Sequence, residues 1–242
     1  MFSVARAANM LSSDLSYASL AELNAAAVKC ERCPRLRKYC QKVAEMKRRQ
    51  FQDWTYWGKP LPGFGDPNAR LLILGLAPAA HGGNRTGRMF TGDGSARFLM
   101  AALYRFGFAN QPVSEKIGDG LVLTDAYLTA IVRCAPPNNK PSASEIETCR
   151  HYWTKELELL SNLRVVLALG RLAFDTYARF LRTQQIETSS FHFGHGSIFK
   201  LPDPYPTVFA SYHPSRQNTQ TGKLTVKMFD KVFQEIRAYL AK

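Results

Sequence analysis

Short apolar runs alternate with longer stretches of helical period from about residue 69 onward. Four of the runs are continuously apolar rather than alternating in polarity, which is typical of parallel strands that are buried on both faces. They lie at residues 70–76, 126–133, 164–169 and 207–212. This order predicts an α/β protein, a three-layer α/β/α sandwich around a central four-stranded, mainly parallel sheet.

The stretches between these runs carry start and stop signals for helices. Gly107 ends the first one, and Ser144 followed by Glu147 predicts a capping box at the start of the next. No repeat or low-complexity linker divides the chain, so we expect a single domain over residues 1–242, with residues 1–60 as a helical and basic N-terminal segment. The expected helices begin near Leu20, Ser95, Ser144, Arg171 and Lys223.

Composition narrows the class of partner. With 242 residues, of which 45% are hydrophobic, the chain can bury a core, so disorder is excluded. A net charge of +13 points to a polyanion, with nucleic acid first and an acidic membrane surface second. No apolar run approaches the roughly 18–20 residues that cross a bilayer, so no membrane insertion is expected. Residues 1–13 show no secretory signal, which predicts a cytoplasmic, reducing compartment.

A long glycine-rich loop, GLAPAAHGGNRTGRMFTGDGS at residues 75–95, follows the first strand. Ligands of open α/β sheets bind at the carboxyl ends of strands, so a loop of this length predicts a ligand site. It lacks the pattern of a phosphate-binding P-loop, which argues against ATP. Phe90 within it is a candidate for stacking on a base, and the alternative is an ordinary core phenylalanine.

A second loop, HPSRQNTQTGKLT at residues 213–225, follows the last strand. His213 falls at the carboxyl end of that strand, and Pro214 then fixes the direction of the chain. Because the carboxyl ends of parallel strands meet at one edge of a sheet, we expect the two loops to converge there.

The two loops together resemble those of family 5 of the uracil-DNA glycosylase superfamily, in the same order, and the likeness extends over roughly residues 30–240. The resemblance implies an enzyme that hydrolyses the N-glycosidic bond of uracil, and in some members of hypoxanthine or xanthine, to start base excision repair. Its partner is DNA containing deaminated bases, and no lyase step is expected. A monomer is sufficient for action on one flipped base.

The same resemblance assigns roles around the reacting bond. His213 matches the histidine that hydrogen-bonds the pyrimidine O2, an interaction of the kind worth roughly 10²–10³ in rate. Ala77 stands where many relatives carry an acid or an amide that positions water. Asn84 is therefore our first candidate for orienting the water and Asp93 the second, although both residue types are also common in turns.

Base and DNA contacts follow from the same loops. Residues 128–131 carry no amide where related families place the asparagine that reads uracil, so we expect a broader substrate range. We expect Arg216 and Lys223 to meet phosphates, which makes binding salt-dependent. The residues expected to bind the base are Gly75, Leu76, Ala77 and Phe90. Those expected against DNA are Ser215, Arg216, Gln217, Asn218 and Lys223.

The cysteines form a separate constellation. Cys30 and Cys33 make a C-x₂-C pair, and Cys134 and Cys149 lie far downstream. Four thiolates suit either tetrahedral zinc or a cubane iron–sulfur cluster, and the spacing alone does not choose. The family resemblance implies a [4Fe–4S] cluster on these four residues, tying the N-terminal segment to the sheet. Cys40 is left over, and the alternative is five ordinary buried thiols.

Two other functions fit part of the pattern. A non-catalytic iron–sulfur DNA-binding module would explain Ala77 as lost chemistry and would bind DNA without releasing a base. A zinc-bearing hydrolase of free nucleotides fits the sheet but does not explain the net charge of +13.

Overall fold

The structure of the protein is a computed structural model that describes residues 16–242. Residues 1–13, in which the sequence shows no secretory signal, lie outside the described residues. A six-stranded sheet runs through the molecule in the order β1-β3-β2-β4-β6-β5. Its four central strands are parallel, and the two edge strands are antiparallel to their neighbours. The strands are β1 (Phe64–Gly65), β2 (Leu71–Gly75), β3 (Ala126–Ala130), β4 (Val165–Leu169), β5 (Ile198–Phe199) and β6 (Thr207–Ser211).

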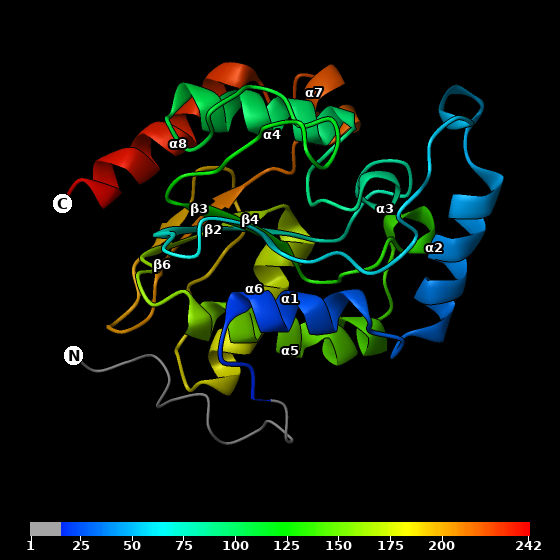
Figure 1. Ribbon diagram of the computed structural model, residues 1–242. Helices are drawn as coiled ribbons and strands as arrows, with labels where there is room; N and C mark the ends of the chain where they lie inside the picture. The colour runs from blue at the N-terminus through cyan, green and yellow to red at the C-terminus, as the bar shows by residue number, and fades with distance from the viewer. Residues whose placement is uncertain (1–15) are drawn as a thin grey trace.

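Helices cover both faces of the sheet (Figure 1). One layer contains α1 (Leu20–Val28), α5 (Ala143–Leu159) and α6 (Arg171–Thr183), and the other contains α4 (Gly94–Arg105) and α8 (Val226–Leu240). The remaining helices are α2 (Pro34–Met46), α3 (Gly83–Thr86) and α7 (Arg216–Gln220), with the 3₁₀ turns η2 (Arg49–Phe51) and η3 (Pro137–Asn139).

Alternate residues of each strand enter two different cores. Leu72 and Leu74 of β2 pack with α1, α2, α5 and α6, whereas Leu71 and Ile73 of the same strand pack with α4 and α8. All five residues of each central strand are buried, because both faces of the sheet are covered. The expected α/β class and three-layer arrangement are therefore confirmed.

The sheet has six strands rather than the four that we expected. The additional strands β1 and β5 are two residues long and pair antiparallel at the two edges. Two residues are too few to display any hydrophobic periodicity, which is why the sequence pattern did not reveal them.

The capping box of α5 also differs from the expected one. Ser142, not Ser144, is the N-cap: its hydroxyl accepts from the backbone N–H of Glu145, and the Glu145 carboxylate accepts from the N–H of Ser142. The sequence contains two overlapping Ser-x-x-Glu patterns, and the helix starts at the first of them, directly after Pro141. The stop signal at Gly107 is confirmed, since this glycine has a left-handed φ of 68° just beyond α4.

An ion pair without access to solvent joins the sheet to α5. Arg133 lies just beyond β3, and its Nη2 is 2.6 Å from Oε1 of Glu156, with 1% and 0% of the side chains exposed. Oε2 of Glu156 accepts a hydrogen bond from Thr129 on β3.

Within residues 16–242, no helix has the length and apolar character needed to cross a membrane.

Candidate active site

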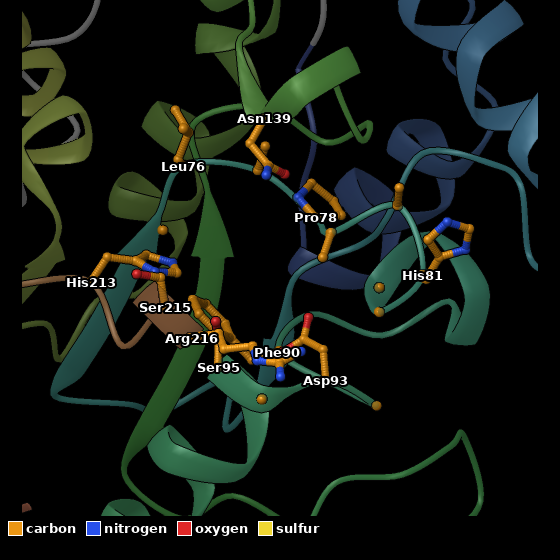
Figure 2. A pocket seen from close by; sticks show the side chains of 18 of the residues that line it. Leu76, Pro78, His81, Phe90, Asp93, Ser95, Asn139, His213, Ser215 and Arg216 are labelled. Carbon is orange, nitrogen blue, oxygen red and sulfur yellow. The ribbon is translucent and has the colours of Figure 1, made fainter. Parts of the chain in front are cut away.

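A cavity of about 1130 Å³ opens at the carboxyl edge of the parallel sheet. Figure 2 shows the side chains of Leu76, Phe90, Asn139 and His213 around an open space. The segment after β2, the segment after β3 and the loop after β6 all reach it, so the two loops converge as the parallel order requires. Of the residues expected at the site, those lining the cavity are Gly75, Leu76, Ala77, Phe90, Asp93, His213, Ser215, Arg216 and Gln217.

Phe90 provides an aromatic wall. Its backbone has a left-handed φ of 46°, a conformation that costs a bulky residue about 1–3 kcal/mol. The ring lies against Gly75, where an added Cβ would come within 2.8 Å of Phe90 Cζ. It also stacks on the ring of His213, with the centroids 6.4 Å apart and the planes at 29°. The strained backbone therefore aims a flat apolar surface at the cavity beside the histidine.

His213 follows the end of β6 and is held from both sides. Its carbonyl accepts a hydrogen bond of 2.8 Å from Nδ2 of Asn218. The backbone N–H of the preceding Tyr212 donates to Nδ1 of His195. Burial lowers the pKa of His213 to about 4, so its ring is neutral at pH 7. A neutral imidazole in this position can donate one hydrogen bond into the cavity.

Asp93 brings a carboxylate to the cavity and also begins α4. One of its oxygens accepts from the backbone N–H of Ala96 at 2.8 Å, which makes Asp93 the N-cap. The other oxygen lies so close to Gly82 that a Cβ there would meet it at 2.2 Å. Burial raises the pKa of Asp93, against the opposing effect of its backbone hydrogen bonds and the nearby cations.

The glycine-rich loop is fixed by a buried cation. The guanidinium of Arg85 lies 4.0 Å from the ring centroids of both Phe51 and Trp54. It donates to the carbonyls of His81 and Gly92 at 2.9 and 2.8 Å. One side chain therefore connects both ends of the loop to the segment around η2, and the cavity has a defined shape.

Asn84, the first candidate for orienting water, is not brought to the cavity. It is fully buried, and its Nδ2 donates to the carbonyls of Cys40 on α2 and Ala80 in the loop. Its Oδ1 has no hydrogen-bond partner among the described residues. The structure places Asn84 behind the loop, between α2 and the cavity wall.

The residues expected against DNA lie along and beyond α7. Ser215 is the N-cap of this helix and accepts from the backbone N–H of Asn218. Ser215 and Arg216 lie next to His213 in Figure 2. Asn218 is turned toward the His213 carbonyl rather than the cavity, and Lys223 is exposed with its ammonium 5.1 Å from the Tyr212 ring.

Sequence reasoning missed several residues of the cavity, above all Asn138 and Asn139. Both line it, and both have left-handed φ values of 54° and 56°. The signal in the sequence was an Asn-Asn pair directly after Pro136 and Pro137, since Asn tolerates this conformation better than most residues. His81 also lines the cavity, and its Nδ1 is 3.0 Å from the hydroxyl of Tyr56.

The four cysteines of the expected cluster all pack on the same core. Cys134 and Cys149 are buried in it, and Cys30 and Cys33 are half-buried against it. Burial raises the pKa of Cys149 to about 12, and the backbone N–H of Arg133 donates to its sulfur at 3.3 Å. Within residues 16–242, however, no three potential ligands are arranged as a metal-binding group.

Cys40, which the spacing left over, is buried beside Cys134. Its thiol donates to the carbonyl of Ala135 at 3.5 Å. A hydrogen bond from Cys134 is the main cause that lowers the pKa of Cys40. Cys30, Cys33, Cys134 and Cys149 reach the same core from three parts of the chain, and thiolate is a donor type that suits zinc or an iron–sulfur cluster.

Fold and cavity together define a class of protein: an α/β protein with a cavity at the carboxyl edge of its sheet, lined by an aromatic side chain, a neutral imidazole and a carboxylate. Comparison with known families makes this specific. The model of the uracil DNA glycosylase superfamily matches residues 62–237. The chain belongs to the uracil DNA glycosylase superfamily.

Individual relatives identify the family within this superfamily. The type-5 uracil-DNA glycosylase of Mycobacterium tuberculosis is 47% identical over 220 residues, which are 90% of this chain and 81% of the relative. That of Thermus thermophilus is 48% identical over 208 residues, 86% of this chain and 92% of the relative. A type-4 enzyme from Sulfurisphaera tokodaii is 25% identical over 200 residues, 81% and 83% of the two chains. The resemblance to family 5 is confirmed.

Proposed function

We propose that this protein is a uracil-DNA glycosylase, which hydrolyses the bond between uracil and deoxyribose in DNA and so starts base excision repair. The observation that carries the proposal is the pairing of Phe90 with a neutral His213 in a cavity at the carboxyl edge. The 47–48% identity to type-5 uracil-DNA glycosylases, over most of the chain, supports the same activity.

The base enters the cavity after rotating out of the duplex, at a cost of a few kcal/mol. It stacks on the ring of Phe90, which is worth roughly 1–3 kcal/mol. Asn139 is placed to hydrogen-bond the edge of the base, because its side chain points into the cavity in Figure 2. Its amide offers both a donor and an acceptor, as uracil requires.

His213 stabilises the leaving base. As the bond between the base and the sugar breaks, its electron pair moves onto the base, and negative charge collects at the pyrimidine O2. The neutral ring of His213 donates a hydrogen bond to this oxygen and keeps its proton there. Such a donor strengthens as charge develops, which lowers the barrier rather than merely binding the substrate.

Asp93 acts on the sugar and on the attacking water. The sugar passes through an oxocarbenium-like cation, which the carboxylate of Asp93 stabilises from the loop. A water held by Asp93 attacks the sugar carbon and transfers a proton to the Asp93 carboxylate, whose pKa is raised by burial. Asn84 contributes indirectly, by fixing the loop to α2. None of the described residues lining the cavity is a lysine, which fits a hydrolase without a Schiff-base lyase step.

DNA lies against α7 and the residues around it. Ser215, Arg216 and Gln217 line the cavity mouth, and Lys223 is exposed beyond them. The net charge of +13 supports a binding affinity that falls steeply as salt rises. One flipped base occupies one cavity, so a monomer is sufficient.

We extend the proposed substrates to hypoxanthine and xanthine. The amide that would restrict the site to uracil is absent from β3, where Thr129 instead donates to buried Glu156 and Ala130 has only a methyl group. A cavity of about 1130 Å³ also has room for a purine. Because no amide on β3 adds to that of Asn139, the site imposes a looser donor pattern and rejects fewer bases.

A [4Fe–4S] cluster held by Cys30, Cys33, Cys134 and Cys149 is part of the proposal. It would join the start of α2, the segment after β3 and α5, and so hold the N-terminal segment to the sheet. Aerobic and anaerobic preparations should be compared for visible absorption and for iron and zinc content. Cys149→Ser should lose the absorption, whereas Cys40→Ser should keep it; zinc without iron would contradict the cluster.

The activity is tested by base release from duplexes that carry one uracil, hypoxanthine or xanthine. His213→Ala should reduce release of uracil by about a hundredfold or more, because it removes the donor to O2. His192→Ala is the matched control, since His192 is exposed and outside the cavity.

The outcomes separate the alternatives. Release by the wild type and the His192 variant, but not by the His213 variant, supports the mechanism. Salt-dependent DNA binding without release of any base would instead favour a binding module. Release of uracil alone would support the glycosylase and contradict the wider substrate range.

A further inference from the structure

A buried network lies behind the wall that Phe90 provides. Buried Arg88, Thr91 and Ser114 make it together with Asp119, whose side chain is 11% exposed, and none of the four lines the cavity. Thr91 and Ser114 have no exposed surface. The mechanism above uses none of these four residues, although Thr91 directly follows Phe90 and Arg88 lies two residues before it.

Thr91 clamps the backbone across Phe90. Its hydroxyl donates to the carbonyl of Met89 at 3.1 Å, so the hydrogen bond spans the left-handed residue. The same oxygen accepts from Nε of Arg88 at 3.0 Å and lies 2.6 Å from the hydroxyl of Ser114. Because the Thr91 proton goes to Met89, Ser114 is the donor in the last contact.

Ser114 connects this clamp to a second loop. Its hydroxyl accepts from Nη2 of Arg88 at 2.8 Å, and its carbonyl accepts from the backbone N–H of Gly92, also at 2.8 Å. The segment 88–92 is therefore held on both sides of Phe90 by one residue of the loop 111–122.

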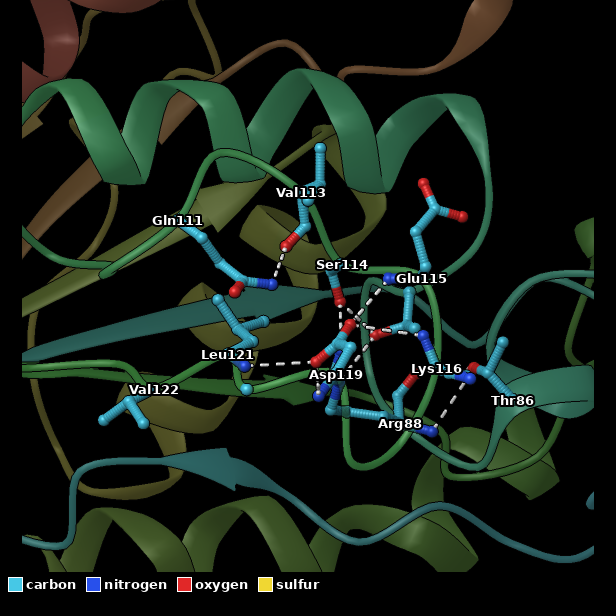
Figure 3. Close-up of polar contacts among 12 residues, drawn as sticks. Thr86, Arg88, Gln111, Val113, Ser114, Glu115, Lys116, Asp119, Leu121 and Val122 are labelled. Carbon is cyan, nitrogen blue, oxygen red and sulfur yellow. Dashed lines mark hydrogen bonds and ion pairs between the residues drawn. The ribbon is translucent and has the colours of Figure 1, made fainter.

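Asp119 holds that loop in place. Its two oxygens pair with the two terminal nitrogens of Arg88 at 2.9 and 2.6 Å. They also accept from the backbone N–H groups of Glu115, Lys116 and Leu121. Figure 3 shows Asp119 at the centre of these contacts. Burial would raise the pKa of Asp119, but these donors outweigh it and hold the pKa well below its usual range.

We propose that Arg88 and Asp119, acting through Ser114 and Thr91, are positioning residues that hold Phe90 in its left-handed conformation and so set the orientation of the flipped base against His213. The inference rests on the proposed function. It gives the loop 111–122 a purpose in catalysis although that loop does not touch the substrate.

The test is a double-mutant cycle on uracil excision, measured at single turnover with saturating enzyme. Ser114→Ala removes only the hydroxyl that joins Arg88 to Thr91 and should slow excision about tenfold. In a Phe90→Ala background, the same change should alter the rate less than twofold, because the ring it positions is gone. Thr91→Val should behave like Ser114→Ala, and Thr91→Ser, which keeps the hydroxyl, should retain the wild-type rate.

Thr207→Val is the matched control. It removes a buried hydroxyl hydrogen bond to Tyr239 at the opposite end of β6 and should leave the rate unchanged. An unaltered rate in folded Ser114→Ala and Thr91→Val, an equal loss in both Phe90 backgrounds, or a wild-type rate for Phe90→Ala would each overturn the inference. If Ser114→Ala does not fold, the comparison of Thr91→Val with Thr91→Ser tests the inference instead. Failure of the wild type to release any base would instead remove the proposed function.

Discussion

In the proposed mechanism, the imidazole of His213 is an uncharged hydrogen-bond donor to the base. Burial achieves this by lowering its pKa to about 4, from about 6.5 in an unfolded chain. Between these values the unfolded chain binds more protons than the folded one. His213 therefore subtracts stability as the pH falls from about 6.5 toward 4, and contributes no such penalty at pH 7.

We expect the ring proton signals of His213, assigned by comparison with His213→Asn, to titrate in NMR spectra with a midpoint near 4. Over the same range, the wild type should lose stability relative to His213→Asn as the pH is lowered from 7 to 5. A midpoint near 6.5 would mean that the ring is charged in weak acid and is not the neutral donor proposed above.

Asn139 tests how the base is read. Asn139→Asp keeps a residue type that tolerates the left-handed backbone but replaces the amide donor with a carboxylate. Excision of uracil should fall about ten- to a hundredfold, because a lost hydrogen bond to a buried polar group costs about 1–3 kcal/mol. Steady-state kinetics on a uracil duplex measure it. Asn68→Asp, on the exposed surface, should change the rate little.

At the scale of elements, the glycine-rich loop and the start of α4 depend on each other. Asp93 begins the helix with one oxygen and packs the other against Gly82. The N-cap therefore also fixes where the carboxylate lies, and the loop must leave room for it.

Gly82→Ala tests this dependence. The added methyl would come within 2.2 Å of the Asp93 oxygen, so the carboxylate has to move and excision should fall at least tenfold. Gly94→Ala, one residue beyond Asp93, meets no atom within 4 Å and is the matched control. Rates and melting temperatures of both variants should be compared. Equal rates would show that the position of the Asp93 carboxylate is unimportant.

At the scale of the whole molecule, the pair between Arg133 and Glu156 joins the sheet to the helical layer that also carries Cys149. Glu156→Gln leaves the Arg133 cation buried without a counter-charge, so the free energy of unfolding in urea should fall by about 3–5 kcal/mol. Replacing both residues, with Arg133→Met and Glu156→Leu, should recover much of this loss. Glu158→Gln breaks a partly exposed pair with Lys155 and should cost less than about 1 kcal/mol.

From the sequence, the place of the site in the fold could be predicted better than the role of each residue in it. His213, Phe90 and Asp93 all line the cavity, because each lies in a loop that directly follows a parallel strand. Asn84 lies in the same loop yet faces α2 instead, and no local pattern distinguishes the two orientations. Asn139 was not predicted as a site residue because it lies outside both loops that carry the family resemblance. It reaches the cavity from the loop after β3.

By itself the sequence determined the α/β class, the four long strands, the approximate starts of five helices and the edge at which the two loops meet. These properties follow from local periodicity and from the rule that parallel strands end at one side. Only the tertiary structure decided which loop residues face the cavity, how Arg85 lies between Phe51 and Trp54, and how Asp119 reaches Arg88. Such contacts join residues from different elements, and their geometry depends on how those elements pack against each other, which no local pattern encodes.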